Sequence, residues 1–477
     1  MNILFIVAEA YPFAKTGGLG DVGGSLPVSL NNAKTNVRVM MPKYGCIPEE
    51  YLNQMRPVTS FSVNLAWRRI ECSIDVLNYQ GAQFYFLNNE YYFHQEKLYG
   101  YDEDGERFAF FCKAALESLT HLNYQPDIIH CNDWHTALIP LMLKENYGKN
   151  PFYFGIRTVL TIHNLKHQGT FPVAIFDDVL GFGGHKTAWE KLEFYGGINY
   201  LKAGLLSADA LTTVSPTYAL EIQNSYFGEN LDGVLRQRKD HLQGILNGID
   251  TKKYDPQNDP NLVVNYRSSL CKKEENKKDL QEILGLPVRI ELPVIAVVSR
   301  LVDQKGLDLL AHILEEMLSM DLQIVILGTG DKKYEEMFNY FAQKFPYKLA
   351  ACVVFDDVLA HKIYGGADIL LMPSQFEPCG LSQMIAMRYG TIPVVRETGG
   401  LRDTVNPYNE LTGEGNGFSF ANYNAHELLF TVQRAVKLFS EDKVAWKGLA
   451  ENARKSDFSW EKPAKQYIEL YKMIGQR

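Results

Sequence analysis

The tetrapeptide Thr-Gly-Gly-Leu stands at residues 16–19 and again at residues 398–401, and each copy is followed two residues later by an aspartate, Asp21 or Asp403. Each copy comes after an apolar run and before a segment that can form a helix. Paired glycines at such a turn leave backbone N–H groups exposed at the positive end of the helix, where anions bind. Two matching turns, one in each half of the chain, predict two nucleotide-binding halves that face one ligand.

Length and composition narrow the class of protein. The chain has 477 residues, more than one hydrophobic core normally serves, so two domains are expected. A net charge of −8 disfavours a protein built mainly to bind nucleic acid. Seven cysteines without a Cys-x-x-Cys pair indicate reduced thiols in a cytoplasm rather than a disulfide scaffold or a zinc site.

The sequence gives no sign of a membrane partner or a leader peptide. The apolar start, residues 1–8, lacks a basic leader and is followed at once by Glu9, so it predicts a buried first strand and not a signal peptide. No apolar run is long enough to span a bilayer. We therefore expect a cytoplasmic protein.

Short apolar runs that alternate with longer helical segments predict doubly wound α/β domains with parallel sheets. The predicted strands are 3–8, 37–41, 127–130, 158–162, 210–214, 293–298, 323–327, 369–372 and 392–395. Predicted helices include 108–119, 307–320, a lysine-rich segment around 272–278, and a terminal helix running to Arg477 whose buried face carries Tyr467, Leu470 and Tyr471. An Asn-Gly turn near residue 247 marks the boundary, which gives domains at 1–245 and 246–457 and a C-terminal segment at 458–477.

Polar side chains follow most of the predicted strands. In open α/β sheets, ligands bind beyond the carboxyl ends of the strands, so we expect these groups to converge on one cleft between the domains. They are Lys15, Asp133, His163, Asn164, Arg300, Lys305, Gly328, Gly330, Glu377 and the two glycine pairs.

Two cations follow the strand at 293–298. Arg300 offers a fork of donors and Lys305 a point charge, a combination that can hold a diphosphate. Lys15, just before the first glycine pair, is a third candidate cation. The alternative for all three is a solvated surface position with ordinary ion pairs.

Asp133 lies in the sequence His130-Cys131-Asn132-Asp133-Trp134-His135. A metal site on the two histidines is disfavoured, because side chains five positions apart at a strand end point in different directions. Asp133 can instead bond sugar hydroxyls or stabilise developing positive charge, and a helix N-cap is its structural alternative. His163 is either a ligand-binding residue or a satisfied structural histidine.

Glu377 precedes Pro378, and proline suits the first position of a helix, so Glu377 is predicted near a helix N-terminus. There it can complement the helix dipole or accept hydrogen bonds from sugar hydroxyls. Cys379 stands beside the same predicted helix start, but the sequence offers no histidine partner for it. We expect packing or substrate contact from Cys379 rather than nucleophilic catalysis.

These motifs together resemble those of the bacterial glycogen synthases and plant starch synthases, and they run along the whole chain. The matching segments are 15–22 (KTGGLGDV), 132–135 (NDWH), 161–165 (TIHNL), 202–204 (KAG), 213–218 (TVSPTY), 247–250 (NGID), 299–301 (SRL), 304–306 (QKG), 377–381 (EPCGL) and 398–401 (TGGL).

The resemblance implies two Rossmann-like domains flanking a cleft, the GT-B architecture, with an acceptor-side first domain, a donor-side second domain and a C-terminal helix that crosses back to the first. It implies transfer of glucose from ADP-glucose to the non-reducing end of an α-1,4-glucan, glycogen or a maltooligosaccharide, with retention of configuration. No metal and no cofactor is expected. The choice between ADP-glucose and UDP-glucose, the oligomeric state and the preferred glucan length stay open.

The resemblance also implies roles for individual residues. The expected catalytic residues are Asp133, His163, Arg300, Lys305 and Glu377. The expected substrate contacts are Lys15, Gly18, Asp21, Asn164, Asn247, Phe355 (against adenine), Cys379, Gly380, Leu381, Thr398, Gly399 and Gly400. Ile385 stands where many related transferases carry a second glutamate, and the Glu-Pro-Cys-Gly-Leu form of residues 377–381 is more similar to glucan synthases than to sucrose-type or lipid-glycosylating enzymes. The competing interpretations are a non-catalytic glucan-binding or sugar-nucleotide-sensing protein and a phosphorylase-like enzyme.

Overall fold

The computed structural model describes residues 1–475 of the chain. Clustering of backbone contacts divides it into two compact units: unit 1 comprises Met1–Gly248 and Trp460–Arg477, and unit 2 comprises Ile249–Ser459. Gln476 and Arg477, which end the predicted terminal helix, lie outside the described residues.

Unit 1 is built on a nine-stranded sheet in the order β12-β11-β7-β6-β1-β2-β5-β4-β3. The strands from β12 to β5 pair in parallel, and β4 and β3 extend the sheet antiparallel. Their bounds are β1 Asn2–Ile6, β2 Asn36–Pro42, β3 Arg56–Leu65, β4 Arg68–Tyr79, β5 Ala82–Asn88, β6 Ile128–Asn132, β7 Arg157–Ile162, β11 Ala210–Thr213 and β12 Leu242–Gly244. A small antiparallel sheet holds β8 Thr170–Pro172, β9 Glu193–Phe194 and β10 Gly197–Asn199.

The helices of unit 1 follow the strands in the alternation expected of a doubly wound domain. They are α1 Gly18–Leu30, α2 Glu49–Leu52, α3 Glu90–Phe93, α4 Asp104–His121, α5 Leu138–Glu145, α6 Ala174–Asp178, α7 Lys186–Leu192, α8 Tyr200–Ser207, α9 Pro216–Glu221 and α10 Asp232–Gln237. Three single 3₁₀ turns, Trp134–Thr136, Pro151–Tyr153 and Lys239–His241, complete the unit.

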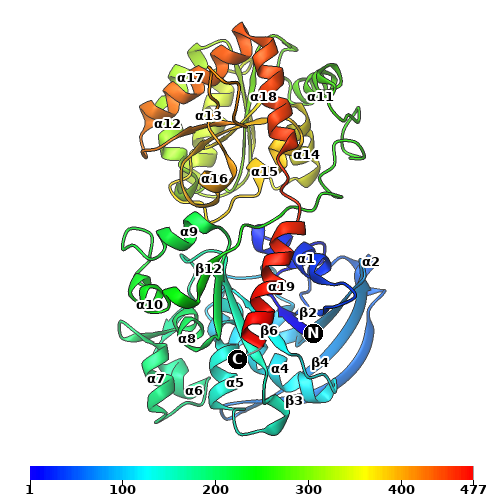
Figure 1. Cartoon of the computed structure of the whole chain (residues 1–477), viewed down its shortest axis with the longest axis vertical. Helices are drawn as coiled ribbons and strands as arrows, with labels where there is room; N and C mark the ends of the chain where they lie inside the picture. Colours follow the sequence, from blue (N-terminus) through cyan, green and yellow to red (C-terminus); the bar gives the residue numbers. More distant parts are fainter. Residues whose placement is uncertain (476–477) are drawn as a thin grey trace. The chain divides into compact units, whose positions relative to one another are not determined.

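The terminal helix α19, Glu461–Gly475, also packs within unit 1. Figure 1 shows it in red against α1, and the Trp460 indole N–H donates to Ser25 Oγ at 2.8 Å. The Tyr471 hydroxyl lies 2.7 Å from the His130 ring. Tyr467, Leu470 and Tyr471 are buried, which confirms the predicted apolar face.

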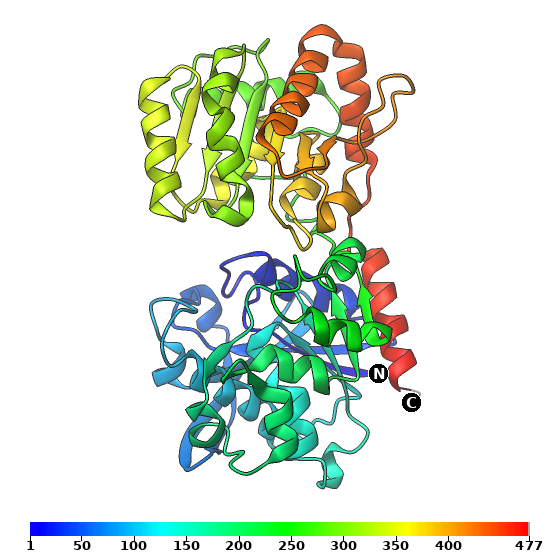
Figure 2. The ribbon, with the colours of Figure 1, turned by 90° about the vertical axis from the view of Figure 1, so that its left-hand side faces the viewer.

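Unit 2 is built on a six-stranded parallel sheet in the order β15-β14-β13-β16-β17-β18. Its strands are β13 Val294–Val298, β14 Gln323–Leu327, β15 Leu349–Cys352, β16 Ile369–Met372, β17 Ile392–Arg396 and β18 Phe418–Phe420. Its helices are α11 Leu270–Ile283, α12 Leu307–Ser319, α13 Lys332–Lys344, α14 Asp357–Gly366, α15 Ser382–Arg388, α16 Gly399–Thr404, α17 Ala425–Glu441 and α18 Lys443–Lys455, with a 3₁₀ turn at Asp303–Lys305. Figure 1 and Figure 2 show α17 and α18, in orange and red, side by side.

The nine predicted strands are all present, with each end within two residues of its predicted position. They are buried along most of their length, as strands covered by helices on both faces must be. The sequence did not predict the other strands of the described chain, which are β3, β4, β5, β8, β9, β10, β12, β15 and β18. Within residues 1–475, no helix combines the length and the apolar content needed to cross a bilayer.

Candidate functional site

The first glycine turn begins helix α1 in unit 1. Gly17 is the N-cap and provides no side chain, so no cap hydrogen bond closes the helix at Gly18. Glu9, which follows β1 and is 3% exposed, accepts hydrogen bonds from the backbone N–H of Thr16 and from its hydroxyl, the latter at 2.7 Å. Burial raises the pKa of Glu9, against the opposing effect of these donors. The carboxyl therefore fixes the turn while the helix end stays open toward an anion.

Lys15 and Asp21, both predicted substrate contacts, pair with each other across this turn. Lys15 Nζ lies 2.8 Å from Asp21 Oδ1, and both side chains are about one-fifth exposed, at 18% and 21%. A bound anion would compete with Asp21 for the ammonium group of Lys15.

Asp133 lies at the carboxyl end of β6 with a strained backbone, at φ 57° and ψ −174°. It occupies the N-cap position of a 3₁₀ turn, but its side chain makes no cap hydrogen bond. Oδ1 accepts instead from the N–H of His163 at 2.6 Å and of Asn164 at 3.4 Å, at the end of β7. The carboxyl is 6% exposed, and burial raises its pKa to about 7. The structure thus brings these three predicted residues together.

His163 is held as a neutral imidazole beside Asp133. Its Nε2 lies 2.9 Å from Asn132 Oδ1, and the Asn132 amide N–H donates to Ile6 O at 3.0 Å. This network assigns the ring proton to Nε2, because the Asn132 oxygen must accept. Burial lowers the pKa of His163 to about 3. Nδ1 is then an unprotonated acceptor suited to a hydroxyl group.

The two neighbouring histidines have structural partners. His130 lies between the hydroxyls of Tyr471 at 2.7 Å and Thr161 at 2.6 Å. His135 packs against the rings of Tyr99, Phe108 and Trp134. In the part of the chain that the structure describes, no group of three or more His, Cys, Asp and Glu side chains is placed to hold a metal ion.

In unit 2 a cation and a carboxylate meet at the carboxyl edge of the sheet. Lys305 Nζ, beyond β13, lies 2.6 Å from Glu377 Oε2, beyond β16, and the Ser374 hydroxyl donates to the same oxygen at 3.0 Å. Glu377 is 6% exposed. Arg300 is exposed, and among residues 1–475 no carboxylate lies within ion-pair distance of its guanidinium.

The second glycine turn packs directly against the Glu377 segment. The N–H of Gly400 donates to the carbonyl of Glu377 at 3.1 Å, and Thr398 donates to Arg396 O at 2.9 Å. A Cβ added at Gly400 would lie 2.2 Å from the carbonyl oxygen of Cys379, and one at Gly399, where φ is 44°, would lie 2.0 Å from that of Glu377. Only glycine permits this approach. Because two of its N–H groups are engaged, the contribution of this turn to ligand binding stays a prediction.

The predicted helix start at Pro378 is wrong. Helix α15 begins at Ser382, because Gly380 adopts a left-handed conformation at φ 71° and separates the Glu377 segment from the helix. Cys379 is buried and Leu381 half-buried, so both pack beneath the segment.

Asn247 and Phe355 are two further predicted substrate residues, one in each unit. Asn247 of unit 1 is 5% exposed, and its Oδ1 is buried without a partner among the described residues. A buried polar atom of this kind is costly unless a ligand or water satisfies it. Phe355 of unit 2 follows β15 and is 68% exposed, which leaves its ring accessible to a planar group.

The carboxyl edges of the two sheets therefore carry different chemistry. Unit 1 presents a buried carboxyl, a neutral histidine and an open helix end. Unit 2 presents cations and a glycine turn fastened to a buried glutamate. Anion binding by the cations and hydroxyl recognition by the carboxyls suit a substrate with a sugar and a phosphate group.

Comparison with known proteins decides the family. The N-terminal part matches the family model described as starch synthase catalytic domain over residues 2–237, and the C-terminal part matches glycosyl transferases group 1 over residues 286–456. A glycogen synthase of Desulfitobacterium hafniense is 51% identical over 475 residues, covering 99% of each chain. The chain belongs to the glycogen synthase and starch synthase family.

Other relatives of the glycogen synthase family agree with this result. A glycogen synthase of Desulforamulus reducens is 52% identical, again over 99% of both chains. The catalytic domain of starch synthase IV from Arabidopsis thaliana, solved bound to ADP and acarbose, superimposes with a TM-score of 0.94 at 33% identity and covers 100% of this chain and 99% of its own. The family assignment makes this chain a glycosyltransferase.

The predicted fold class is also confirmed. A sucrose-phosphate synthase from Thermosynechococcus elongatus, at 18% identity and a TM-score of 0.62, shares the fold over 99% of this chain and 98% of its own. Both solved relatives have the GT-B architecture of α/β glycosyltransferases, as the resemblance implied.

Glu9 is a buried residue of the candidate site that the sequence analysis missed. It was read only as the polar residue that ends the first apolar run. A carboxylate directly after a buried strand, seven residues before a glycine turn, was the available signal.

Proposed function

We propose that the protein is a glycogen synthase that transfers glucose from ADP-glucose to the non-reducing 4-hydroxyl of an α-1,4-glucan, with retention of configuration. The observation that carries the proposal is the 2.6 Å pair of Lys305 and Glu377 beside the second glycine turn. It sits in a chain similar to glycogen synthases along 99% of its length. ADP in the solved starch synthase supports an adenine nucleotide as donor.

The diphosphate is assigned to the cations. Charge accumulates on the leaving diphosphate as the bond to the sugar breaks, and fixed cations stabilise that charge without reorganising. Arg300 has no carboxylate partner among the described residues, and Lys305 needs only to shift from Glu377. Lys15 and the open end of helix α1 at Gly18 supply further positive potential.

The transferred glucose is assigned to Asp133, His163 and Glu377. The neutral Nδ1 of His163 accepts a hydroxyl hydrogen bond, and Asp133 stabilises positive charge that develops on the sugar. When the donor draws Lys305 away, Glu377 gains free acceptor capacity for sugar hydroxyls. Asp21, Asn164, Asn247 and the segment 379–381 complete the proposed substrate contacts, with Phe355 against adenine.

We assign the donor to unit 2 and the acceptor glucan to unit 1, so residues of both units act in one reaction. The acceptor hydroxyl attacks from the side of the departing phosphate, and a phosphate oxygen takes its proton. This route yields retention without an enzyme nucleophile. A glucosyl ester trapped on Asp133 or Glu377 would overturn it. We place the reaction in the cytoplasm, where reduced thiols such as the seven free cysteines persist.

The test is a donor comparison. The protein is incubated with a maltooligosaccharide and either ADP-glucose or UDP-glucose, and nucleotide release and chain extension are measured together. We expect faster release of ADP than of UDP and an α-anomeric product by proton NMR. Failure to extend the glucan with either donor would contradict the proposal and favour a binding protein.

A further inference from the structure

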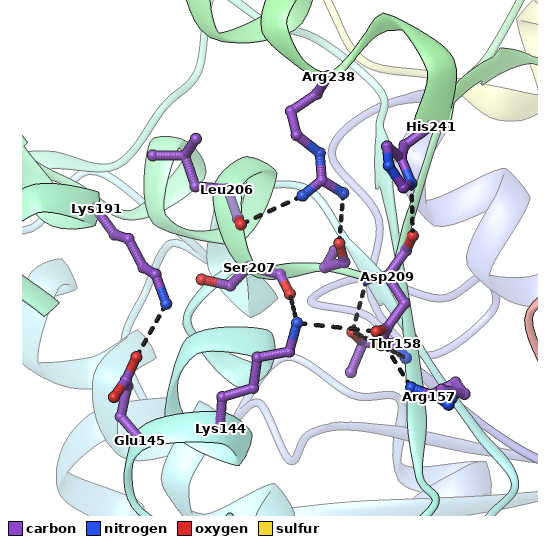
Figure 3. Close-up of polar contacts among 11 residues, drawn as sticks. Lys144, Glu145, Arg157, Thr158, Lys191, Leu206, Ser207, Asp209, Arg238 and His241 are labelled. Carbon is purple, nitrogen blue, oxygen red and sulfur yellow. Dashed lines mark hydrogen bonds and ion pairs between the residues drawn. The ribbon is translucent and has the colours of Figure 1, made fainter. Parts of the chain in front are cut away.

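A hollow in unit 1 lies at the edge of the sheet opposite the candidate site. Its volume is about 250 Å³, and it is lined by Lys144, Arg157, Ala208, Asp209, Arg238, His241 and Ile474. Arg157 begins β7, Asp209 precedes β11 and His241 precedes β12, so the hollow faces the amino ends of three parallel strands (Figure 3). The sugar and phosphate contacts proposed above follow the carboxyl ends.

The positive charge of the hollow exceeds its negative charge. Three permanent cations, Lys144, Arg157 and Arg238, share one carboxylate, Asp209, which leaves a formal charge of 3 − 1 = +2 on the lining. The whole chain carries −8, so this local excess is not a general property of the protein.

The carboxylate of Asp209 already accepts hydrogen bonds from Thr158. Asp209 Oδ2 accepts from the N–H of Thr158 at 2.8 Å and from its hydroxyl at 2.9 Å. The other oxygen, Oδ1, lies 3.8 Å from both Lys144 Nζ and Arg157 Nη1. These ion pairs are too long for hydrogen bonds, so Asp209 leaves donor capacity on both cations unused.

The cations are held in place by carbonyl groups. Arg238 Nη2 donates to Ala208 O at 2.6 Å, and Lys144 Nζ donates to Ser207 O at 2.5 Å (Figure 3). Arg238 Nε is buried and has no hydrogen-bond partner in the described chain. Such contacts fix the position of a cation without neutralising it, and an orphan guanidinium N–H is costly.

Repulsion among the cations of the hollow affects the pKa of Lys144. Burial lowers the pKa of Lys144, and repulsion from Lys191, Arg238 and Arg157 lowers it further, against the opposing effect of Asp209. A bound anion would relieve this repulsion. Arginine forks and a lysine point charge together are the side chains that recognise phosphate.

We propose that this hollow is a binding site for a phosphate dianion, either free or as the end group of a small phosphomonoester. A dianion matches the excess of +2. The volume of 250 Å³ is several times the roughly 30 Å³ that a water molecule occupies in the liquid, so it accommodates more than a single monatomic ion. Because Ile474 belongs to α19, the occupant would contact the C-terminal helix and link it to the sheet edge.

Calorimetric titration with inorganic phosphate at constant ionic strength tests the site, with excess ADP present to occupy the proposed donor site. We expect saturable binding to the wild-type protein. The Arg157 guanidinium makes no hydrogen bond within the described residues and lies 3.8 Å from Asp209, so Arg157→Gln should leave the fold intact, and the Kd should rise about tenfold. Lys144→Gln should act in the same direction.

Two control variants separate the site from general charge effects. Lys191, also drawn in Figure 3, pairs with Glu145 at 2.9 Å and does not line the hollow, so Lys191→Gln should raise the Kd much less than Arg157→Gln does. Lys305→Ala in unit 2 should leave the Kd unchanged. A wild-type protein without saturable phosphate binding would overturn the proposal, as would equal weakening by Arg157→Gln and Lys191→Gln.

A second titration with glycerol phosphate distinguishes the two sources of the dianion. Tighter binding of glycerol phosphate than of inorganic phosphate identifies a phosphomonoester site. Equal or weaker binding identifies a free phosphate site. In either case Arg157→Gln must weaken the binding, and a Kd that this variant does not change would place the anion elsewhere.

Discussion

The two copies of Thr-Gly-Gly-Leu have the same sequence but different surroundings. In unit 1 the turn is held from one side by the Glu9 carboxyl, and a Cβ at Gly17 would meet nothing within 4 Å. In unit 2 the turn is packed against carbonyl groups of the Glu377 segment, and Glu377 itself pairs with Lys305. The first turn thus has open space beside Gly17, whereas the second turn is packed tightly against the segment that carries Glu377.

The three buried carboxyls of the candidate site follow the same division. Asp133 and Glu9 of unit 1 accept from backbone N–H groups, without a cation within ion-pair distance in the described chain. Glu377 of unit 2 has an ammonium partner. Backbone donors hold a carboxyl in place permanently, while a lysine can leave when a diphosphate arrives, so the substrate can switch only the second arrangement.

The largest effect is expected when the cation of unit 2 is removed. Lys305→Ala should lower kcat by about 10²–10³-fold, because a fixed donor to the leaving diphosphate is lost. Steady-state rates at saturating ADP-glucose measure this. Lys333→Ala is the matched control, because this exposed lysine of unit 2 pairs with Asp303 at 2.5 Å and not with Glu377. A near-normal kcat in Lys305→Ala would remove the proposed difference between the units.

Alanine at the two turns should give opposite results. Gly399→Ala, the equivalent of Gly17→Ala, places a Cβ 2.0 Å from Glu377 O and must displace the Glu377 segment, so we expect kcat to fall about 10²-fold. Gly17→Ala meets open space and should cost less than about 1 kcal/mol of unfolding free energy, with little loss of rate. Steady-state kinetics and thermal unfolding of both variants measure these two effects. Equal losses of kcat in the two variants would contradict the proposed difference between the turns.

Asp133→Asn tests the buried carboxyl of unit 1 through pH. The pKa of Asp133 in the folded protein, about 7, lies above its usual value, so its protonated form favours folding and that contribution is lost as pH rises through 7. Asparagine keeps an acceptor for His163 N–H without the charge. We expect the variant to gain roughly 1–3 kcal/mol of stability relative to wild type at pH 8 and little at pH 4. Denaturant unfolding at both values measures this, and a pH-independent difference would contradict the assigned cause.

The smallest effect is expected from the carboxyl that holds the first turn. Glu9→Gln retains one acceptor but loses the charge, which weakens the bonds to Thr16 N–H and Oγ1. We expect kcat/KM for ADP-glucose to fall about tenfold, mainly through KM. Thr16→Val, which keeps the N–H and removes the hydroxyl, should show part of the same effect. An unchanged KM in both variants would exclude a positioning role for Glu9.

The sequence predicted the parallel strands well because strands buried on both faces are continuously apolar. Strands β3 and β4 were not predicted, because they pair antiparallel and alternate buried with exposed residues along much of their length. The predicted start of helix α15 lies too early. Pro378 suits a first helical position, but the left-handed conformation of Gly380, which the sequence does not reveal, delays the helix.

For the candidate site, the predicted ends of the strands showed which residues lie at the carboxyl edges of the sheets. They did not show which residues pair with one another. The pairs Lys15–Asp21 and Lys305–Glu377 join residues that were predicted separately. The contact of Asp133 with His163 N–H depends on the register of β6 and β7, which lies beyond sequence spacing. The orphan oxygen of Asn247 likewise depends on the packing around it.

The most direct test of the account is a single-turnover transfer of labelled glucose from ADP-glucose to a maltooligosaccharide, with wild type, Asp133→Asn and Lys305→Ala compared under identical conditions. We expect one added α-linked glucose with wild type and a transfer rate at least about 10²-fold lower in each variant, because each unit is proposed to supply an essential group. Transfer at the wild-type rate by either variant, or none by wild type, would contradict the account.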